Sequence, residues 1–177
     1  MTEHALQPAE PGRAYDTDVV IIGAGPVGLF TVFELGLLDI RAQLVDILSV
    51  PGGQCAELYP EKPIYDIPAL PVVTGQELTH RLLEQIKPFA PAFHAGQLAA
   101  ALHKEQDEDG RDIWKLETDL GTSIRARAVI IAAGGGSFVP KKPAIPKIEE
   151  YEGISVFYAV RQMERFRDQR LVIAGGG

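Results

Sequence analysis

Cysteine is almost absent from this sequence: Cys55 is the only one, so no disulfide can form within the chain. No apolar run is long enough to cross a bilayer, and residues 1–16 lack the apolar core of a signal peptide. Acidic residues outnumber basic ones, and the net charge of −7 disfavours nucleic acid as a general partner. We therefore predict a cytoplasmic chain without membrane or nucleic-acid contacts, whose residues 1–16 form a disordered tail.

Histidine is also scarce and scattered. The four histidines, at positions 4, 80, 94 and 103, lack the spacing of metal ligands, and no Ser/His/Asp grouping is visible. The sequence therefore predicts neither a metal site nor a catalytic side chain. Hydrophobic residues, by contrast, make up 46% of the 177 residues, which is enough for the core of one domain and the start of another.

The most informative stretch runs from Asp18 to Phe30. Four apolar residues, 19–22, are typical of a buried parallel strand. Three glycines follow with G-x-G-x-x-G spacing, and apolar residues then recur near the helical period from Leu29 to Leu37. This strand–turn–helix context is the one that the dinucleotide-binding fingerprint requires.

Each residue of the turn has an expected task. Gly23 allows the tight turn, Gly25 lets the backbone approach a pyrophosphate, and Gly28 lets the helix pack closely on the strand. Pro26 suits a first helical turn, and the N–H groups around Val27 open a helix whose dipole favours phosphate.

A second strand, residues 42–45, ends at Asp46, at about the distance expected for the acid that binds ribose hydroxyls. The alternative, a glycine-rich turn in an ordinary α/β domain, does not explain Asp46. We therefore predict a nucleotide site here, and the spacing alone allows either FAD or NAD.

The rest of the first domain follows an α/β pattern. Residues 47–73 form a long irregular stretch that is rich in apolar and aromatic residues, so we expect it to be ordered and packed on a ligand. Thr74 and Glu77 form a capping box for a helix that stops near Lys87-Pro88. A short parallel strand is then expected at 92–93. An antiparallel β meander follows at 97–104, 112–118 and 123–127, and a further apolar strand at 128–132.

The end of the chain repeats its beginning. Residues 171–177, LVIAGGG, match residues 19–25, VVIIGAG, so that Gly175 corresponds to Gly23 and Gly177 to Gly25. A short strand at 155–157 and a helix at 160–167 are expected before it; the alternative is simply another buried strand. We interpret the repeat as the truncated start of a second Rossmann-like domain, and expect the polypeptide to continue past residue 177.

This division predicts a Rossmann-like α/β domain with an inserted β meander over residues 17–138, a linker over 139–150, and the start of a second domain over 151–177. Two such folds in tandem resemble the two-domain flavin reductases related to glutathione and thioredoxin reductase. Three segments resemble the thioredoxin-reductase-like type of ferredoxin–NADP reductase more closely: GGQCAELYPEKPIYDIP at 52–68, AAGGGSFVPKKP at 132–143 and YEGISVFYAV at 151–160.

The resemblance implies an enzyme, a homodimer, with FAD in the first fold and NADP(H) in the second, that exchanges electrons with ferredoxin or flavodoxin. Neither redox dithiol of the wider group is present. Pro60 stands where glutathione-reductase-like members have a second cysteine, and residues 157–160, FYAV, stand about where thioredoxin-reductase-like members have Cys-x-x-Cys. Cys55 is therefore expected to be a small packed residue beside the flavin. The alternatives are a monooxygenase or quinone reductase of the same class, or a non-catalytic FAD-binding fragment.

The resemblance also implies residue roles. Asp46 would bind the adenosine ribose of FAD, and its charge would repel a 2′-phosphate. Gln54 would contact the flavin or ribityl chain and Tyr59 would stack on the isoalloxazine ring. Ala99 would meet the adenine through its backbone, and Phe138 would pack near the flavin. The alternatives are a turn residue for Gln54 and ordinary core positions for Tyr59 and Phe138.

Overall fold

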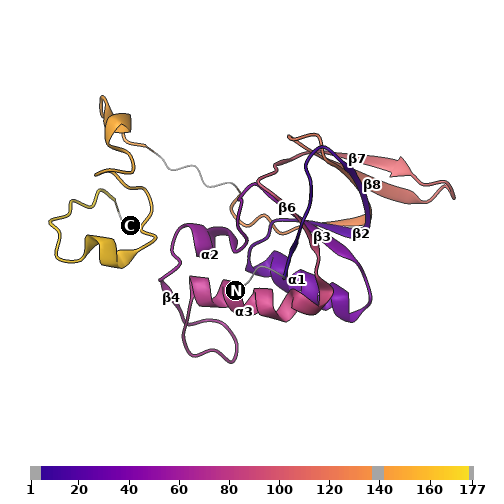
Figure 1. Ribbon diagram of the computed structural model, residues 1–177, viewed down its shortest axis with the longest axis horizontal. Coiled ribbons are helices and arrows are strands. Elements are labelled where there is room, and N and C mark those ends of the chain that lie inside the picture. The colour runs from indigo at the N-terminus through magenta and orange to yellow at the C-terminus, as the bar shows by residue number, and fades with distance from the viewer. Residues whose placement is uncertain (1–4, 137–141, 176–177) are drawn as a thin grey trace.

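The computed structural model describes residues 5–136 and 142–175 (Figure 1). Its strands are β1 (Gln7–Pro8), β2 (Ala14–Ile22), β3 (Ala42–Asp46), β4 (Pro63–Ile64), β5 (Val73–Thr74), β6 (Ala92–Ala95), β7 (Ala99–Gln106), β8 (Asp112–Thr118) and β9 (Ser123–Ile131). Its α-helices are α1 (Pro26–Leu37), α2 (Gly53–Glu57) and α3 (Gly75–Ile86), and short 3-10 helices are η1 (Lys87–Phe89), η2 (Ile148–Tyr151) and η3 (Met163–Phe166).

Seven strands form one sheet in the order β1-β6-β3-β2-β9-β8-β7. The first five strands of this order are parallel to one another, whereas β8 and β7 continue the sheet in antiparallel fashion. The predicted α/β fold, a parallel sheet with an antiparallel meander, is therefore confirmed.

The central strands β2 and β3 are buried on both faces, as their apolar residues predict. On one face, Val19 and Ile21 pack with residues of α1 and α3, and Figure 1 shows both helices on the same side of the sheet. On the other face, Val20 and Val45 pack with Leu116 of β8. The meander therefore covers the face that the helices leave open.

The third helix begins with the predicted capping box. The Thr74 hydroxyl accepts a hydrogen bond from the Glu77 N–H (3.2 Å), and the Glu77 carboxylate accepts one from the Thr74 N–H (2.9 Å). The helix ends at Ile86, and Lys87-Pro88 lies in the 3-10 turn η1, as expected.

The prediction of a disordered tail over residues 1–16 is wrong for the part that the structure describes. The Gln7 N–H donates to the Pro91 carbonyl (3.0 Å) and the Ala9 N–H donates to that of Phe93 (3.1 Å), while Ala5 is only 4% exposed. This segment covers an edge of β6 that would otherwise be open, and β2 starts as early as Ala14.

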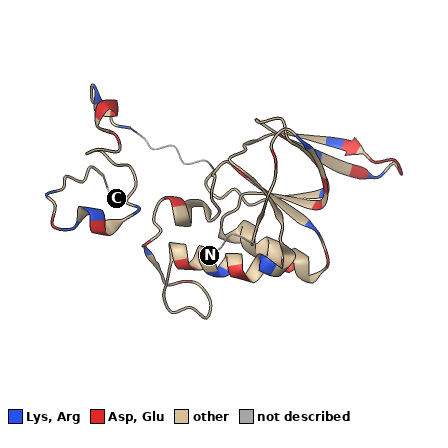
Figure 2. Ribbon diagram, viewed as in Figure 1, with Lys and Arg blue, Asp and Glu red and all other residues tan. Residues whose placement is uncertain are grey.

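The meander also differs from its prediction at its end. The strands expected at 123–127 and 128–132 are one continuous strand, β9. Its first half, Ser123 to Ala126, pairs with β8, while its whole length runs parallel to β2. One strand therefore serves both the meander and the parallel sheet, a double pairing that no local pattern reveals. Charged residues gather on the hairpin of β7 and β8 (Figure 2).

Residues 142–175 differ most from expectation. The predicted strand at 155–157 is reduced to one bridge between Glu152 and Val156, and the predicted helix at 160–167 to η3. The described part of the predicted strand at 171–177 is not a strand, and Val172 is 97% exposed. The reason is that a parallel strand needs neighbouring strands, and this segment has none within the described residues.

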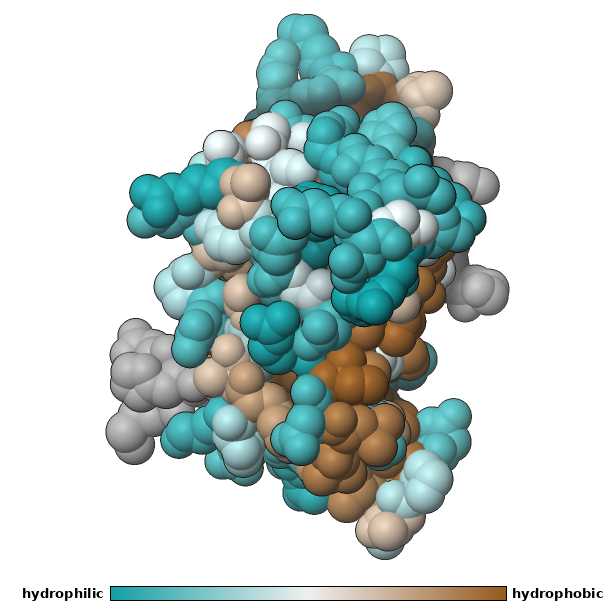
Figure 3. Space-filling model, turned by 90° about the vertical axis from the view of Figure 1, so that its right-hand side faces the viewer, coloured by the Kyte–Doolittle hydropathy of each residue, from teal (hydrophilic) through white to brown (hydrophobic). Residues whose placement is uncertain are grey.

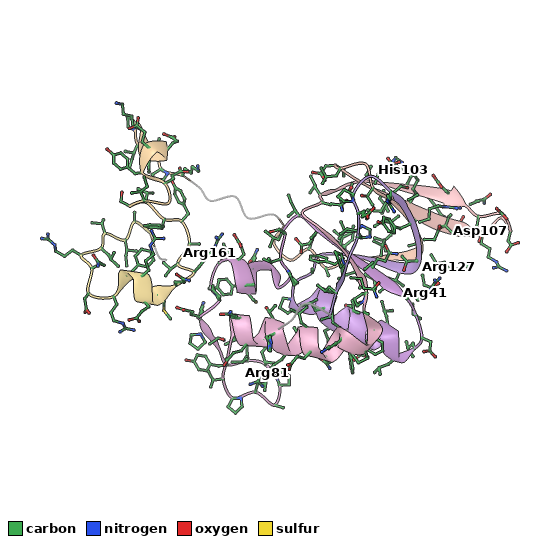
Figure 4. All side chains as sticks on the ribbon, in the orientation of Figure 1. Arg41, Arg81, His103, Asp107, Arg127 and Arg161 are labelled. Atoms are coloured by element: carbon green, nitrogen blue, oxygen red, sulfur yellow. The ribbon has the colours of Figure 1, made fainter. Side chains whose placement is uncertain are left out.

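Two contacts attach this segment to the region of α2 (Figure 4). The Arg161 guanidinium forms an ion pair with the Glu57 carboxylate and donates to the Glu57 carbonyl (3.0 Å). The Met163 N–H donates to the Glu61 carboxylate (2.8 Å). None of the described helices is both long and apolar enough to cross a membrane.

Candidate dinucleotide-binding site

Four parallel strands end at the same edge of the sheet. β2 ends at Ile22, β3 at Asp46, β6 at Ala95 and β9 at Ile131. In open α/β sheets, ligands bind in the crevice outside such carboxyl ends. Most of the predicted site residues that the structure describes lie in the segments that follow these four ends.

Gly23 and Gly28 are required by the packing of the chain itself. Gly23 has a φ of +109°, and a side chain there would overlap the Ala132 carbonyl oxygen. A side chain at Gly28 would overlap the Gly23 carbonyl oxygen, so helix and turn are in direct backbone contact. The predicted tight turn and close helix–strand approach are therefore present.

Gly25 is different, because none of the described residues requires a glycine there. Its φ is −73°, and an added Cβ would meet only the Gly53 Cα, at an ordinary 3.9 Å. Gly25 is also the N-cap of α1, yet no side chain among residues 5–136 and 142–175 caps this helix, and its first turn contains no acidic residue. The positive end of α1 thus meets an open, glycine-lined space, which fits a pyrophosphate group.

Pro26 and Val27 form the first turn of α1. Pro26 has no N–H to leave unpaired, which is why it is tolerated at this position. The Val27 side chain is 67% exposed, although its residue type usually lies in a core.

Asp46 lies directly beside the glycine turn. Its carboxylate accepts hydrogen bonds from the Ala24 N–H (2.7 Å) and the Leu48 N–H (2.9 Å). Asp46 therefore fixes the turn to the end of β3. Each carboxylate oxygen retains a further lone pair, so these bonds are compatible with the expected ribose contact.

The segment that begins α2 lies against the same turn. The Gly52 N–H donates to the Ala24 carbonyl (2.8 Å), and a side chain at Gly53 would come within 3.0 Å of the Gly25 Cα. Gln54 reaches toward the loop after β9, since a side chain at Gly135 would meet the Gln54 amide nitrogen at 2.9 Å. Three glycine-rich segments that are distant in sequence, at 23–28, 52–53 and 134–136, therefore lie close together.

Tyr59 and Cys55 lie one helical turn apart in and just after α2, and both are half-buried. Burial raises the pKa of the Cys55 thiol and that of the Tyr59 hydroxyl. The thiol therefore stays protonated at neutral pH, unlike the low-pKa cysteines that attack disulfides. The Lys62 ammonium lies over the Tyr59 ring, 5.5 Å from its centroid.

Ala99 is the first residue of β7 and is half-buried. The loop before it is tied to the end of β3, because the Gly96 N–H donates to the Leu48 carbonyl (3.0 Å) and the Gln97 N–H to the Asp46 carbonyl (2.9 Å). Ala99 thus follows a loop that borders Asp46, as an adenine contact requires.

Gly175 is the one predicted site residue among the described residues that is not joined to this edge. Phe138 and Gly177 lie outside the described residues. Gly175 is described, but it lies in an exposed coil rather than at the end of a strand. The structure therefore gives no geometry for the second nucleotide site.

Sequence reasoning passed over Gln97. Its buried side-chain oxygen accepts hydrogen bonds from the hydroxyls of Thr118 (2.9 Å) and Thr122 (2.6 Å), which ties the meander to the loop beside Asp46. The signal was a lone amide in the otherwise apolar stretch from Ala95 to Leu102.

Two open hollows, of about 400 and 360 Å³, lie at the opposite ends of the strands, and both are bordered by Asp16 and Arg41. Several of their charges are paired: Arg41 lies 3.2 Å from Asp18, and Arg127 lies 4.0 Å from Asp107 (Figure 4). The hydrogen bonds from Arg41 lower the pKa of Asp18. No group of three potential metal-ligating side chains occurs within residues 5–136 and 142–175.

No protein-family model matches the chain. The chain is 65% identical over 161 residues to a ferredoxin–NADP reductase of Parvibaculum lavamentivorans, which covers 91% of this chain and 46% of that protein. It is 62% identical over 165 residues to a ferredoxin–NADP reductase of Bradyrhizobium sp., which covers 93% of this chain and 47% of that protein. The chain thus spans about half the length of the curated relatives it matches.

Solved structures share the fold. Thioredoxin reductase of Lactococcus lactis superimposes with a TM-score of 0.57 at 24% identity, over 76% of this chain and 40% of that one. A cyclohexanone monooxygenase superimposes with a TM-score of 0.57 at 23% identity, over 76% of this chain and 30% of that one. These likenesses show the fold alone, whereas the sequence is similar to those of ferredoxin–NADP reductases over about half of their length.

Proposed function

We propose that this chain forms the FAD-binding part of an enzyme that carries electrons between NADPH and ferredoxin. The names of relatives at 65% and 62% identity support the reaction. The assignment of the cofactor rests on the open space at Gly25, at the uncapped start of α1. A pyrophosphate fits this space, which supports a dinucleotide over FMN, since FMN has no pyrophosphate. The choice of FAD over NAD rests on the resemblance.

The adenosine half of FAD would be held by the glycine turn and its neighbours. Gly25 would admit the pyrophosphate, which the N–H groups of the first turn of α1 would bind. Asp46, already fixed by the Ala24 N–H, would accept hydrogen bonds from the ribose hydroxyls. The backbone of Ala99 would contact the adenine.

The flavin half would be held by the segment around α2. Gln54 would contact the ribityl chain or the ring, Tyr59 would stack on the ring, and Phe138 would pack near it. Bound FAD supplies the redox chemistry, because a flavin takes up two electrons together and releases them singly. The residues of the chain bind and orient the cofactor, and none of them needs to act as an acid or base.

The resemblance supports three further proposals. Gly175 and Gly177 would begin the turn that binds NADP(H). The enzyme would be a cytoplasmic homodimer, and flavodoxin would be an alternative acceptor to ferredoxin.

The polypeptide at its natural length tests the proposed function. After acid release, the bound cofactor should be FAD, and NADPH should drive the reduction of ferredoxin. Release of FMN would overturn the cofactor assignment. FAD without ferredoxin reduction, together with a C4a-oxygen adduct on mixing the reduced protein with oxygen, would indicate a monooxygenase instead.

A further inference from the structure

The turn between α2 and β4 holds Tyr59 and Lys62 at a fixed separation. The Lys62 N–H donates to the Tyr59 carbonyl (3.1 Å), which closes the turn. The Gly75 N–H donates to the Lys62 carbonyl (3.3 Å) and the Gln76 N–H to the Pro60 carbonyl (2.9 Å). These bonds attach the turn to the first residues of α3, a helix with a complete capping box.

The backbone of α2 and of the turn also packs closely against Gly75, the first residue of α3. A side chain at Gly75 would come within 2.6 Å of the Cys55 carbonyl oxygen and within 3.1 Å of the Tyr59 carbonyl oxygen. The backbone that carries Tyr59 therefore cannot move toward α3. The orientation of the ring is left to the groups around its own side chain.

Lys62 is such a group. Its ammonium lies over the face of the Tyr59 ring, 5.5 Å from the centroid, within the range of a cation–π interaction. Lys142 lies at a similar 5.6 Å over Tyr158, but Glu152 binds both that ammonium and that hydroxyl. In the described part of the chain, no carboxylate forms an ion pair with Lys62, so its contact is with the ring.

We propose that Lys62 is a positioning residue for the flavin, which occupies one face of Tyr59 and so directs the opposite face to the isoalloxazine ring. This inference rests on the proposed stacking of Tyr59. An aromatic ring has two faces, and only the face without the ammonium can meet a flat ligand. Lys62 thereby decides which face that is, and holds the ring in place before the cofactor binds.

The experiment uses the polypeptide at its natural length, loaded with FAD. The variants are Lys62→Met, Lys62→Arg, Tyr59→Ala and the double variant Lys62→Met/Tyr59→Ala, with Lys62→Gln as a second neutral variant should Lys62→Met fail to fold. Lys87→Met is the matched control, because Lys87 is an exposed lysine at the end of α3. The readouts are the FAD content, the absorption bands of the bound flavin and its fluorescence per bound FAD.

We expect Lys62→Met to shift the flavin bands and to raise the fluorescence toward the value of Tyr59→Ala. Lys62→Arg and Lys87→Met should match the wild type, and Lys62→Met should add nothing once Tyr59 is alanine. An unchanged spectrum in Lys62→Met, with a changed one in Tyr59→Ala, would overturn the role of Lys62 and leave the proposed function intact. An unchanged spectrum in Tyr59→Ala would remove both residues from the flavin, and a wild type without FAD would refute the proposed function itself.

Discussion

The three glycines of the first turn differ in what a side chain would meet. Gly23 and Gly28 face backbone carbonyls of the chain itself, so their side chains are excluded by the fold. Among the described residues, Gly25 faces only Gly53, at van der Waals distance, so none of them excludes a side chain there. The missing side chain at Gly25 is consistent with the proposed pyrophosphate position.

This contrast predicts opposite effects for two alanine substitutions. Gly28→Ala should destabilise the fold by about 1–3 kcal/mol or more, because the added methyl overlaps the Gly23 carbonyl. Gly25→Ala should leave the free energy of unfolding of the apoprotein nearly unchanged, yet weaken FAD binding. Urea unfolding of the apoprotein and titration with FAD measure the two quantities. Full FAD affinity in Gly25→Ala would contradict the placement of the pyrophosphate.

His94 is a buried histidine without a charged partner. Its side chain is fully buried, and its Nε2 lies 2.7 Å from the Gln43 Oε1, while its Nδ1 has no partner among the described residues. Because the Gln43 Nε2 points to the Asp16 carbonyl (3.4 Å), the Gln43 oxygen faces His94, which then carries its proton on Nε2. Burial lowers the pKa of His94 from 6.5 to about 4.

A lowered pKa makes the fold sensitive to acid. The native state binds fewer protons than the unfolded state, so the stabilisation is complete above pH 6.5 and is lost as the pH falls toward 4. We expect a loss of up to about 3 kcal/mol over this window. Urea unfolding at several pH values should show a smaller loss in His94→Gln, while His80→Gln, at an exposed position, should behave as the wild type. An identical pH dependence in His94→Gln would contradict this assignment.

The two long helices begin differently, although both follow strands of the same domain. At α3, Thr74 and Glu77 satisfy the first N–H groups with their own side chains. At α1, Gly25 provides no side chain, and the N–H groups of the first turn remain free of any capping side chain. The capping box of α3 stabilises the fold, whereas the uncapped N-terminus of α1 lies at the candidate site.

The contribution of the α3 capping box to the free energy of unfolding can be measured directly. Thr74→Ala removes the hydroxyl that accepts the Glu77 N–H, and should lower the free energy of unfolding by about 1 kcal/mol. Thr31→Ala is the matched control, since the Thr31 hydroxyl only donates to the Val27 carbonyl within α1 (2.8 Å), and alanine is the better helix former. Urea denaturation measures both. Equal effects of the two substitutions would show that the capping box is not a source of stability.

The described residues differ greatly in how much they are buried. Both core clusters belong to residues 5–136, whereas Ile148 is the one buried hydrophobic residue described between 142 and 175. Apolar surface also remains exposed on the first domain. Leu37 and Leu38, at the end of α1, are 61% and 70% exposed. Figure 3 shows an apolar patch below the hydrophilic hairpin, on the face where this end of α1 lies.

This uneven burial predicts how the 177-residue chain responds to shortening. Removal of residues 142–177 should change the thermal midpoint little, because exposed ion pairs such as Arg161–Glu57 contribute at most about 1 kcal/mol. Removal of residues 1–9 should lower it more, because Ala5 and the pairing of β1 with β6 would be lost. Circular dichroism during heating compares the two. A larger loss from the carboxyl-terminal deletion would contradict this ranking.

Patterns between residues that are close in sequence predicted several elements correctly. The strand, the glycine turn and the helix over residues 19–37 are adjacent in sequence, and so are the residues of the capping box, so their patterns can be recognised without a fold. The strand at 112–118 is local in the same sense. These elements appeared where they were predicted.

The remaining features depend on residues that meet only in the folded chain. Asp46 meets the glycine turn across 22 residues of sequence, and Gly53 meets Gly25 from another segment. The ordered amino-terminal segment and the double pairing of β9 follow from open sheet edges that the sequence does not display. Patterns between near neighbours thus predicted the strand, the glycine turn and the helix, whereas folding brought Asp46 and Gly53 to that turn. The physical reason is that propensity and spacing act between near neighbours, whereas burial and strand pairing depend on which distant segments share a surface.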